Sequence, residues 1–235
     1  MSPREPRHPA ETSPSEVDAF LEAVAKTPVV TAESGRGRLV FAIDATASRQ
    51  PTWDLASHWQ ARMFEETARL GTLDVQLVYF RGYGEFHVLP WTRDARQLQT
   101  AMVEVHCRSG LTQVLRVLDH ALAEHRRERV SALVYVGDCL EEDPEAVEAR
   151  AARLGLEGLP AFVFHEGHDP VAAAAFRQLA HLSGGAYAPF DQRSPALLGE
   201  LLGAVAAYAV GGLPALEDRA GRSETARRLL VQLRR

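Results

Sequence analysis

The chain is poor in cysteine and lysine, and its acidic residues outnumber its basic ones. Its 235 residues include two cysteines, Cys107 and Cys139, which are too few for a disulfide framework or a cysteine zinc site. Lys26 is the sole lysine. The formal net charge of -5 offers no basic footprint for nucleic acid, so we expect no nucleic-acid partner.

The sequence also shows no pattern typical of a membrane segment or an export signal. The first residues, MSPREPRHPAETSPSE, contain no apolar run, so we expect no signal peptide. The most apolar segment, 196–213, is interrupted by Glu200, and its leucines recur at helical spacing. This pattern favours a helix packed on a sheet over a membrane span. We therefore expect no membrane contact and a cytoplasmic location.

Length and composition fit one medium domain with extensions at both ends. Hydrophobic residues make up 46% of the chain and charged residues 24%, as is usual for globular proteins. We expect an N-terminal extension over 1–37 with a short helix, opened by a capping box at Ser13. The domain itself is expected over 38–212. A basic C-terminal tail with six arginines is expected over 213–235.

Apolar runs of strand length alternate with segments of helical periodicity. Strands are expected at Leu39–Ile43, Leu73–Phe80, Phe86–Trp91, Val130–Val136, Leu159–Phe164 and Ala186–Phe190, and helices at Pro51–Leu70, Asp94–Val105, Thr112–Arg127, from Asp143, at Val171–Leu182 and at Pro195–Val210. The alternation predicts an α/β fold, a Rossmann-like three-layer αβα sandwich with a mainly parallel six-stranded sheet. Because only a hairpin-length connection precedes it, the strand at 86–91 should be antiparallel at the sheet edge.

Side chains with oxygen atoms follow two of the most apolar strands. Asp44, Thr46 and Ser48 come directly after the strand at 39–43, and Asp138 follows the strand at 130–136. Open parallel sheets bind ligands at the carboxyl ends of the strands, where the strand order reverses. If these strands are neighbours there, the two carboxylates converge and offer hard ligands for Mg²⁺ or Ca²⁺. Taken alone, the first loop is better explained by side chains that only cap turns and helix ends.

Three loops in order resemble the von Willebrand factor A domain family and its metal-ion-dependent adhesion site. The family pattern is D-x-S-x-S after the first strand, a Thr in a second loop and an Asp in a third. Here the first loop reads DATAS from Asp44 to Ser48, the second is SGLT ending at Thr112, and the third is VGD ending at Asp138. A later SGG before the last expected strand is similar to another family segment. The first loop departs from the pattern where Thr46 replaces Ser.

This resemblance implies a metal site and a binding function. The implied ligands are Asp44, Thr46, Ser48, Thr112 and Asp138, around Mg²⁺ with Mn²⁺ or Ca²⁺ as alternatives, some through water. One coordination position stays open for an acidic side chain of another protein. The implied protein is a non-enzymatic, bacterial binding domain, and an AAA+ ATPase or a larger assembly is implied as its partner.

Two other functions remain open at this stage. A Mg²⁺-dependent phosphohydrolase or phosphotransferase could use an Asp after the first strand as its nucleophile. Against it, the loop has no second Asp two residues after Asp44, and no lysine lies near the later loops. The other alternative is a scaffold whose metal site is vestigial and binds no ion.

The other polar groups near these loops are expected to have ordinary structural roles. The acids at 141–143 are expected to form a solvated helix start that raises the local cation concentration. The segment His165–Asp169 lacks the spacing of a helical zinc motif and is expected to be a polar rim loop beside the site. Cys107 and Cys139 lie in or beside the second and third loops, and they are expected to be packing residues.

Overall fold

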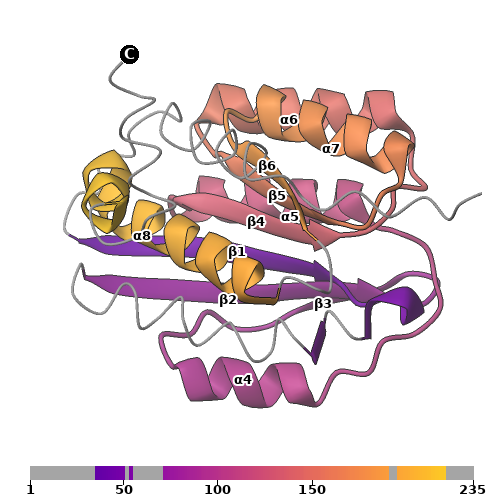
Figure 1. Ribbon diagram of the computed structural model, residues 1–235, viewed down its shortest axis with the longest axis horizontal. Helices are drawn as coiled ribbons and strands as arrows, with labels where there is room; N and C mark the ends of the chain where they lie inside the picture. The colour runs from indigo at the N-terminus through magenta and orange to yellow at the C-terminus, as the bar shows by residue number, and fades with distance from the viewer. Residues whose placement is uncertain (1–34, 51–52, 55–70, 191–194, 221–235) are drawn as a thin grey trace, which may run out of the picture.

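The fold is an open, twisted sheet with helices on both faces. A computed structural model describes residues 35–50, 53–54, 71–190 and 195–220 (Figure 1). The helix expected within 1–37, nearly all of the one expected at 51–70, and the tail beyond 220 lie outside the described residues. The strands are β1 (Arg36–Asp44), β2 (Thr72–Arg81), β3 (Glu85–Val88), β4 (Ala132–Gly137), β5 (Ala161–Glu166) and β6 (Ala186–Phe190).

The sheet has six strands in the order β3-β2-β1-β4-β5-β6. Its neighbouring strands pair in parallel except β2 and β3, which are antiparallel. The expected fold class and the antiparallel edge strand are therefore confirmed. The central strands β1 and β4 are buried almost throughout, which explains why their sequences are continuous apolar runs rather than alternating ones.

Helices cover the sheet from both sides. They are α4 (Ala95–Val103), α5 (Val114–Arg127), α6 (Pro144–Glu157), α7 (Pro170–Leu182) and α8 (Pro195–Ala220), with a short 3-10 helix η1 at Ala47–Arg49. One buried cluster joins α4 and α8 to one face of the sheet, and a second joins α5, α6 and α7 to the other. Figure 1 shows α8 running across β1 and β2. These layers are the predicted αβα sandwich.

The segment labelled α8 consists of two helices joined at Gly212, where φ is 64° and ψ is −158°. The first of them ends close to Val210, as expected, and the second continues to Ala220. That positive φ is favourable only for glycine, and Pro214 is tolerated because it begins a new helical turn. Among the described helices, none combines the length and apolar character needed to cross a membrane.

The strand order reverses between β1 and β4. From β1 the chain moves outward to β2 and β3, whereas from β4 it moves the other way to β5 and β6. Ile43 pairs with Val136, so the carboxyl ends of both strands finish side by side. Loops that leave such a switch point face a common crevice, which places the residues after Ile43 and Val136 next to one another.

Candidate metal centre

Asp44 ends β1 with its side chain fully buried. Its Oδ1 accepts a hydrogen bond of 2.7 Å from the backbone N–H of Thr46. Its Oδ2 is buried and has no hydrogen-bond partner among the described residues. Burial raises the pKa of Asp44 to about 6, although the bond from Thr46 opposes this. A buried carboxylate oxygen without a partner is costly, and a cation beside it would remove that cost.

Asp138 reaches the same place from the loop after β4. Its Oδ2 accepts a hydrogen bond of 2.8 Å from the Ser48 hydroxyl, and its Oδ1 is buried with no partner in the described part of the chain. The hydroxyl oxygens of Ser48 and Thr46 lie 3.5 Å apart. The first and third loops are thus connected by hydrogen bonds, and each of the two carboxylates keeps one free oxygen.

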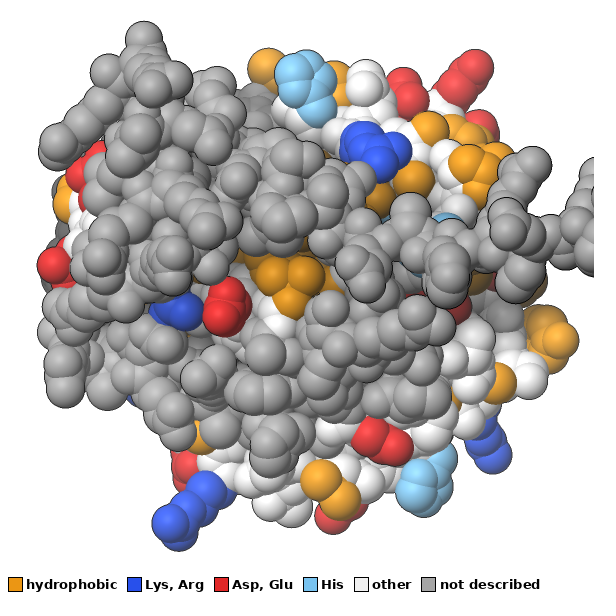
Figure 2. Space-filling view, viewed as in Figure 1, with side chains coloured by type: hydrophobic (Ala, Val, Ile, Leu, Met, Phe, Trp, Pro, Cys, Tyr) orange, Lys and Arg blue, Asp and Glu red, His pale blue; other side chains and the backbone are white. Residues whose placement is uncertain are grey.

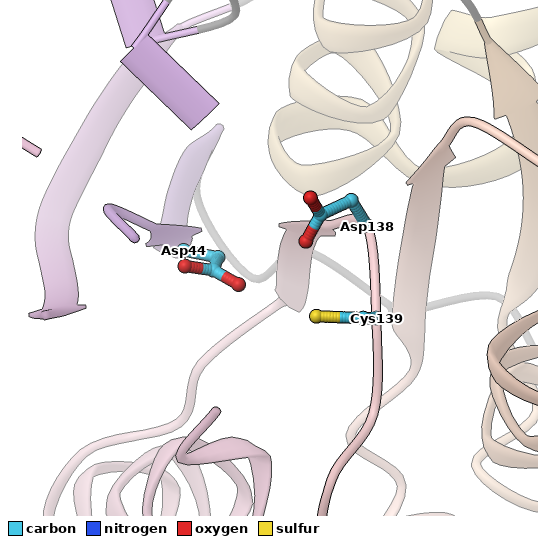
Figure 3. Close-up of side chains that lie close together, drawn as sticks. All are labelled: Asp44, Asp138 and Cys139. Atoms are coloured by element: carbon cyan, nitrogen blue, oxygen red, sulfur yellow. The ribbon is translucent and has the colours of Figure 1, made fainter. Parts of the chain in front are cut away.

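A sulfur atom lies beside these oxygens. One carboxylate oxygen from Asp44, one from Asp138 and the Sγ of Cys139 all lie within 4.8 Å of one another. Figure 3 shows the three side chains around a common space, with the sulfur of Cys139 directed into it. Burial, and then the carboxylate of Asp138, raises the pKa of the Cys139 thiol. From the sequence, Cys139 was expected to be a packing residue, and its sulfur was not counted among the donors.

Thr112 is held against the third loop rather than against the carboxylates. Its hydroxyl accepts a hydrogen bond of 3.0 Å from the N–H of Glu141, and its own N–H donates to Glu141 Oε2 at 2.8 Å. Within the described residues, no hydrogen bond joins Thr112 to Asp44 or Asp138. Hydrogen bonds therefore connect four of the predicted ligands directly, and Thr112 is held beside the third loop through Glu141.

Glu141 and Asp143 are exposed and Asp143 caps α6, as expected for a solvated helix start, whereas Glu142 is half-buried and caps a different helix. Glu142 accepts hydrogen bonds from the N–H groups of Val114 and Leu115, at 2.7 and 2.8 Å. These groups begin α5, whose N-cap residue Gln113 makes no side-chain cap. The carboxylate of Glu142 therefore supplies both the cap and the charge that a helix N-terminus favours. Since Glu141 and Glu142 both bind the start of α5, the second and third loops are fixed to one another.

Replacing Glu142 with alanine should lower the free energy of unfolding by about 1–2 kcal/mol, because two partly buried amide groups at the start of α5 lose their acceptor. Urea denaturation followed by circular dichroism measures the change. Glu148→Ala, on the helix that follows the same loop, is the matched control and should cost less than about 0.5 kcal/mol. Equal costs for the two variants would show that the cap contributes nothing.

A buried arginine lies next to the carboxylates. Arg49, at the end of η1, is fully buried and forms an ion pair with Glu166 at the end of β5. Burial lowers the pKa of Arg49, whereas the charges of Asp138 and Asp44 raise it, so both carboxylates act on the guanidinium. Asp44, Asp138 and Glu166 together oppose one positive charge. This excess of negative charge is what a divalent cation would neutralise.

The polar segment His165–Asp169 has two parts: its first two residues continue β5, and the remaining three form the loop that was expected. His165 and Glu166 belong to β5, with exposed fractions of 1% and 7%. His165 donates from Nε2 to the carbonyl oxygen of Asp138 at 3.1 Å, and its Nδ1 lies 2.8 Å from the hydroxyl of Tyr187. The burial of both side chains is tolerated because each has a polar partner. His165 therefore fixes the backbone that carries Asp138.

The raised pKa of Asp44 predicts a pH effect on the metal-free protein. Its pKa is about 6 in the folded state and about 3.9 in an unfolded chain, so the folded state binds more protons between these values. Stability from this group should therefore fall as the pH rises from 4 to 7, by on the order of 3 kcal/mol.

Urea denaturation at pH 4 and pH 7 in the presence of chelator tests the effect, with Asp44→Asn as the reference because asparagine does not titrate. The stability of Asp44→Asn relative to the unmodified chain should be higher at pH 7 than at pH 4. A difference that stays constant between the two pH values would mean that Asp44 titrates normally.

The comparisons with known proteins concern the fold. No sequence family and no curated protein matches the chain. Among solved structures, it is similar to the von Willebrand factor type A structure from Catenulispora acidiphila, with a TM-score of 0.57 and 19% identity over 75% of this chain and 43% of that one. The SpRpn10 VWA domain gives a TM-score of 0.55 and 16% identity over 75% of this chain and 97% of that one.

A third similar structure carries a metal. It is proximal thread matrix protein 1 from the mussel byssus with a zinc-occupied MIDAS motif, with a TM-score of 0.58 and 16% identity over 76% of this chain and 48% of that one. The chain thus spans less than half of the Catenulispora and mussel structures, but nearly all of the SpRpn10 domain. Together the likenesses define the fold as that of a von Willebrand factor A domain.

Proposed function

We propose that this chain is a divalent-metal-dependent protein-binding domain. Asp44 and Asp138 hold the ion with help from the hydroxyl groups of Thr46 and Ser48, and Thr112 contributes from the second loop. An open coordination position then accepts a carboxylate from a partner protein. The domain has no catalytic activity of its own, works in the cytoplasm of a bacterium, and serves in an assembly of several proteins, such as one built around an AAA+ ATPase.

The observation that supports this proposal most strongly is the pair of free carboxylate oxygens. Asp44 Oδ2 and Asp138 Oδ1 are both buried and without hydrogen-bond partners among the residues described. They come from neighbouring strand ends at the switch point of the sheet, beside an excess of negative charge. Buried oxygens in this state are stabilised by a cation, and oxygen donors suit Mg²⁺, Mn²⁺ and Ca²⁺.

The burial of Asp44 argues against a phosphohydrolase. In such an enzyme the Asp after the first strand must reach the phosphorus atom of a substrate. Here the exposed fraction of Asp44 is 0%, and one of its oxygens is bound to the loop backbone. A binding function needs only that the ion, rather than this carboxylate, face the partner.

The test uses Mn²⁺ as the ion and acetate as the simplest partner carboxylate. Chelator-stripped protein loaded with Mn²⁺ should enhance water-proton relaxation, because water occupies the open position, and millimolar acetate should reduce this enhancement by displacing that water. Asp138→Asn should lose the enhancement. Asp119→Asn, an exposed carboxylate paired with Arg150, should keep it. Bound Mn²⁺ with no response to acetate would contradict the open position.

A further inference from the structure

The donor set at this site includes sulfur as well as oxygen. Cys139 follows Asp138 directly, and its Sγ is one of the three donor atoms that lie within 4.8 Å of one another. In Figure 3 the sulfur faces the space that the two carboxylates share. Cys139 is half-buried, so the thiol is held within the loop while a partner could still approach.

The buried oxygen of Asp44 indicates independently that this space is built for a cation. Asp44 is fully buried, yet its Oδ2 has no hydrogen-bond partner in the described chain. Nearby donors are already engaged, since the hydroxyl of Ser48 donates to Asp138. A cation between the carboxylates and the sulfur would complete the coordination of this oxygen.

We propose that Cys139 is a ligand of the ion and that the site therefore selects a zinc-type cation over Mg²⁺. This inference rests on the proposed function, whose metal site it refines. Thiolate is a soft donor that suits Zn²⁺ and Co²⁺, whereas Mg²⁺ requires oxygen ligands in near-octahedral geometry. When the ion binds, the thiol proton leaves to solvent and a sulfur–metal bond forms, with no change of oxidation state.

The dimensions of the site are compatible with zinc. At tetrahedral angles, bonds of about 2.0 Å to oxygen and about 2.3 Å to sulfur place the donors of a zinc ion about 3.5 Å from one another. The donors of Asp44, Asp138 and Cys139 lie within 4.8 Å of one another, so side-chain movements of about 1 Å would bring them onto one ion. Three protein donors leave the fourth tetrahedral position for water or for the partner's carboxylate.

The second cysteine provides a matched control. Cys107 lies in the loop before α5, and its backbone N–H donates to the side-chain oxygen of Gln50 at 2.9 Å. It is not a member of the donor group formed by Asp44, Asp138 and Cys139. Since the chain contains no further cysteine, the variants Cys139→Ser and Cys107→Ser separate the two thiols completely.

The experiment is a titration of chelator-stripped, reduced protein with Co²⁺, followed by absorption spectroscopy. We expect a near-ultraviolet sulfur-to-cobalt charge-transfer band that saturates at one ion per chain, and displacement of Co²⁺ by Zn²⁺ but not by millimolar Mg²⁺. Cys107→Ser should retain the band. Cys139→Ser should lose it and bind Zn²⁺ at least about tenfold more weakly, because a hard hydroxyl replaces a soft thiolate.

The possible failures are distinguishable. Saturable Co²⁺ or Mn²⁺ binding without a sulfur band, unchanged in Cys139→Ser, would overturn the role of Cys139 and leave the proposed metal-dependent function intact. If none of the ions binds, both the metal-dependent function and the role of Cys139 are overturned. A band that persists in Cys139→Ser but disappears in Cys107→Ser would assign the sulfur ligand to the other loop and also reject the inference.

Discussion

Replacing Arg49 with methionine is expected to lower the free energy of unfolding of the metal-free protein by about 3–5 kcal/mol. Arg49 is fully buried and paired with Glu166, which is itself 7% exposed. Methionine fills a similar volume but carries no charge. Glu166 would then lie buried without a counter-ion, which is the situation that makes a broken buried ion pair costly.

Guanidinium chloride would mask this electrostatic effect, so urea denaturation in chelator is the appropriate measurement. Arg126→Met is the control, because Arg126 forms its ion pair with Glu157 at the surface, where solvent screens the charges, and its loss should change the stability little. Adding Glu166→Gln to Arg49→Met should recover part of the loss by removing the stranded charge. A cost for Arg49→Met no larger than that of the control would show that the buried pair does not stabilise this end of the sheet.

Replacing both Asp44 and Asp138 with asparagine is expected to weaken binding of a divalent ion at least about a hundredfold while preserving the fold. Asparagine removes the negative charge but keeps an oxygen that can accept from Thr46 N–H and Ser48 Oγ, as the aspartates do. The anionic ligands carry most of the attraction for a hard or borderline cation. In the absence of metal, the variant should be at least as stable as the unmodified chain, because a buried charge with a raised pKa disappears.

Titration calorimetry measures the change in ion binding. Thermal unfolding in the presence of chelator measures the change in stability. Asp74→Asn is the control, since Asp74 is a buried carboxylate in β2 that pairs with Arg36 and Arg93 instead of lying at the switch point. It should keep the ion affinity. An unfolded asparagine double variant would indicate that Asp44 and Asp138 have a structural role instead.

The sheet could be predicted because its central strands carry an unambiguous pattern. β1 and β4 are uninterrupted apolar runs, each followed by polar residues, and only strands covered on both faces have that composition. The inference that Asp44 and Asp138 converge required the two strands to be neighbours at a switch point, and they are. The helical segment that follows Gly212 was not predicted, although the end of the preceding helix near Val210 was.

The parts of the site that the sequence did not reveal depend on contacts between distant segments. Arg49 and Glu166 meet because η1 lies near the end of β5, and no local spacing connects them. Glu142 was expected to be solvated because its role as a cap involves α5, a helix that precedes it in the chain. Among these features, the position of Cys139 could have been recognised from the sequence, since Cys139 directly follows the predicted ligand Asp138.

The most direct test of the metal site is equilibrium dialysis of the chelator-stripped, reduced chain against Zn²⁺, Mn²⁺ and Mg²⁺ in separate experiments, with the bound metal measured per chain. We expect one ion per chain at saturation, retained by the unmodified protein and lost from the variant in which Asp44 and Asp138 are both asparagine. Absence of bound metal at millimolar concentrations of all three ions, or equal retention by that variant, would contradict a metal site at the switch point.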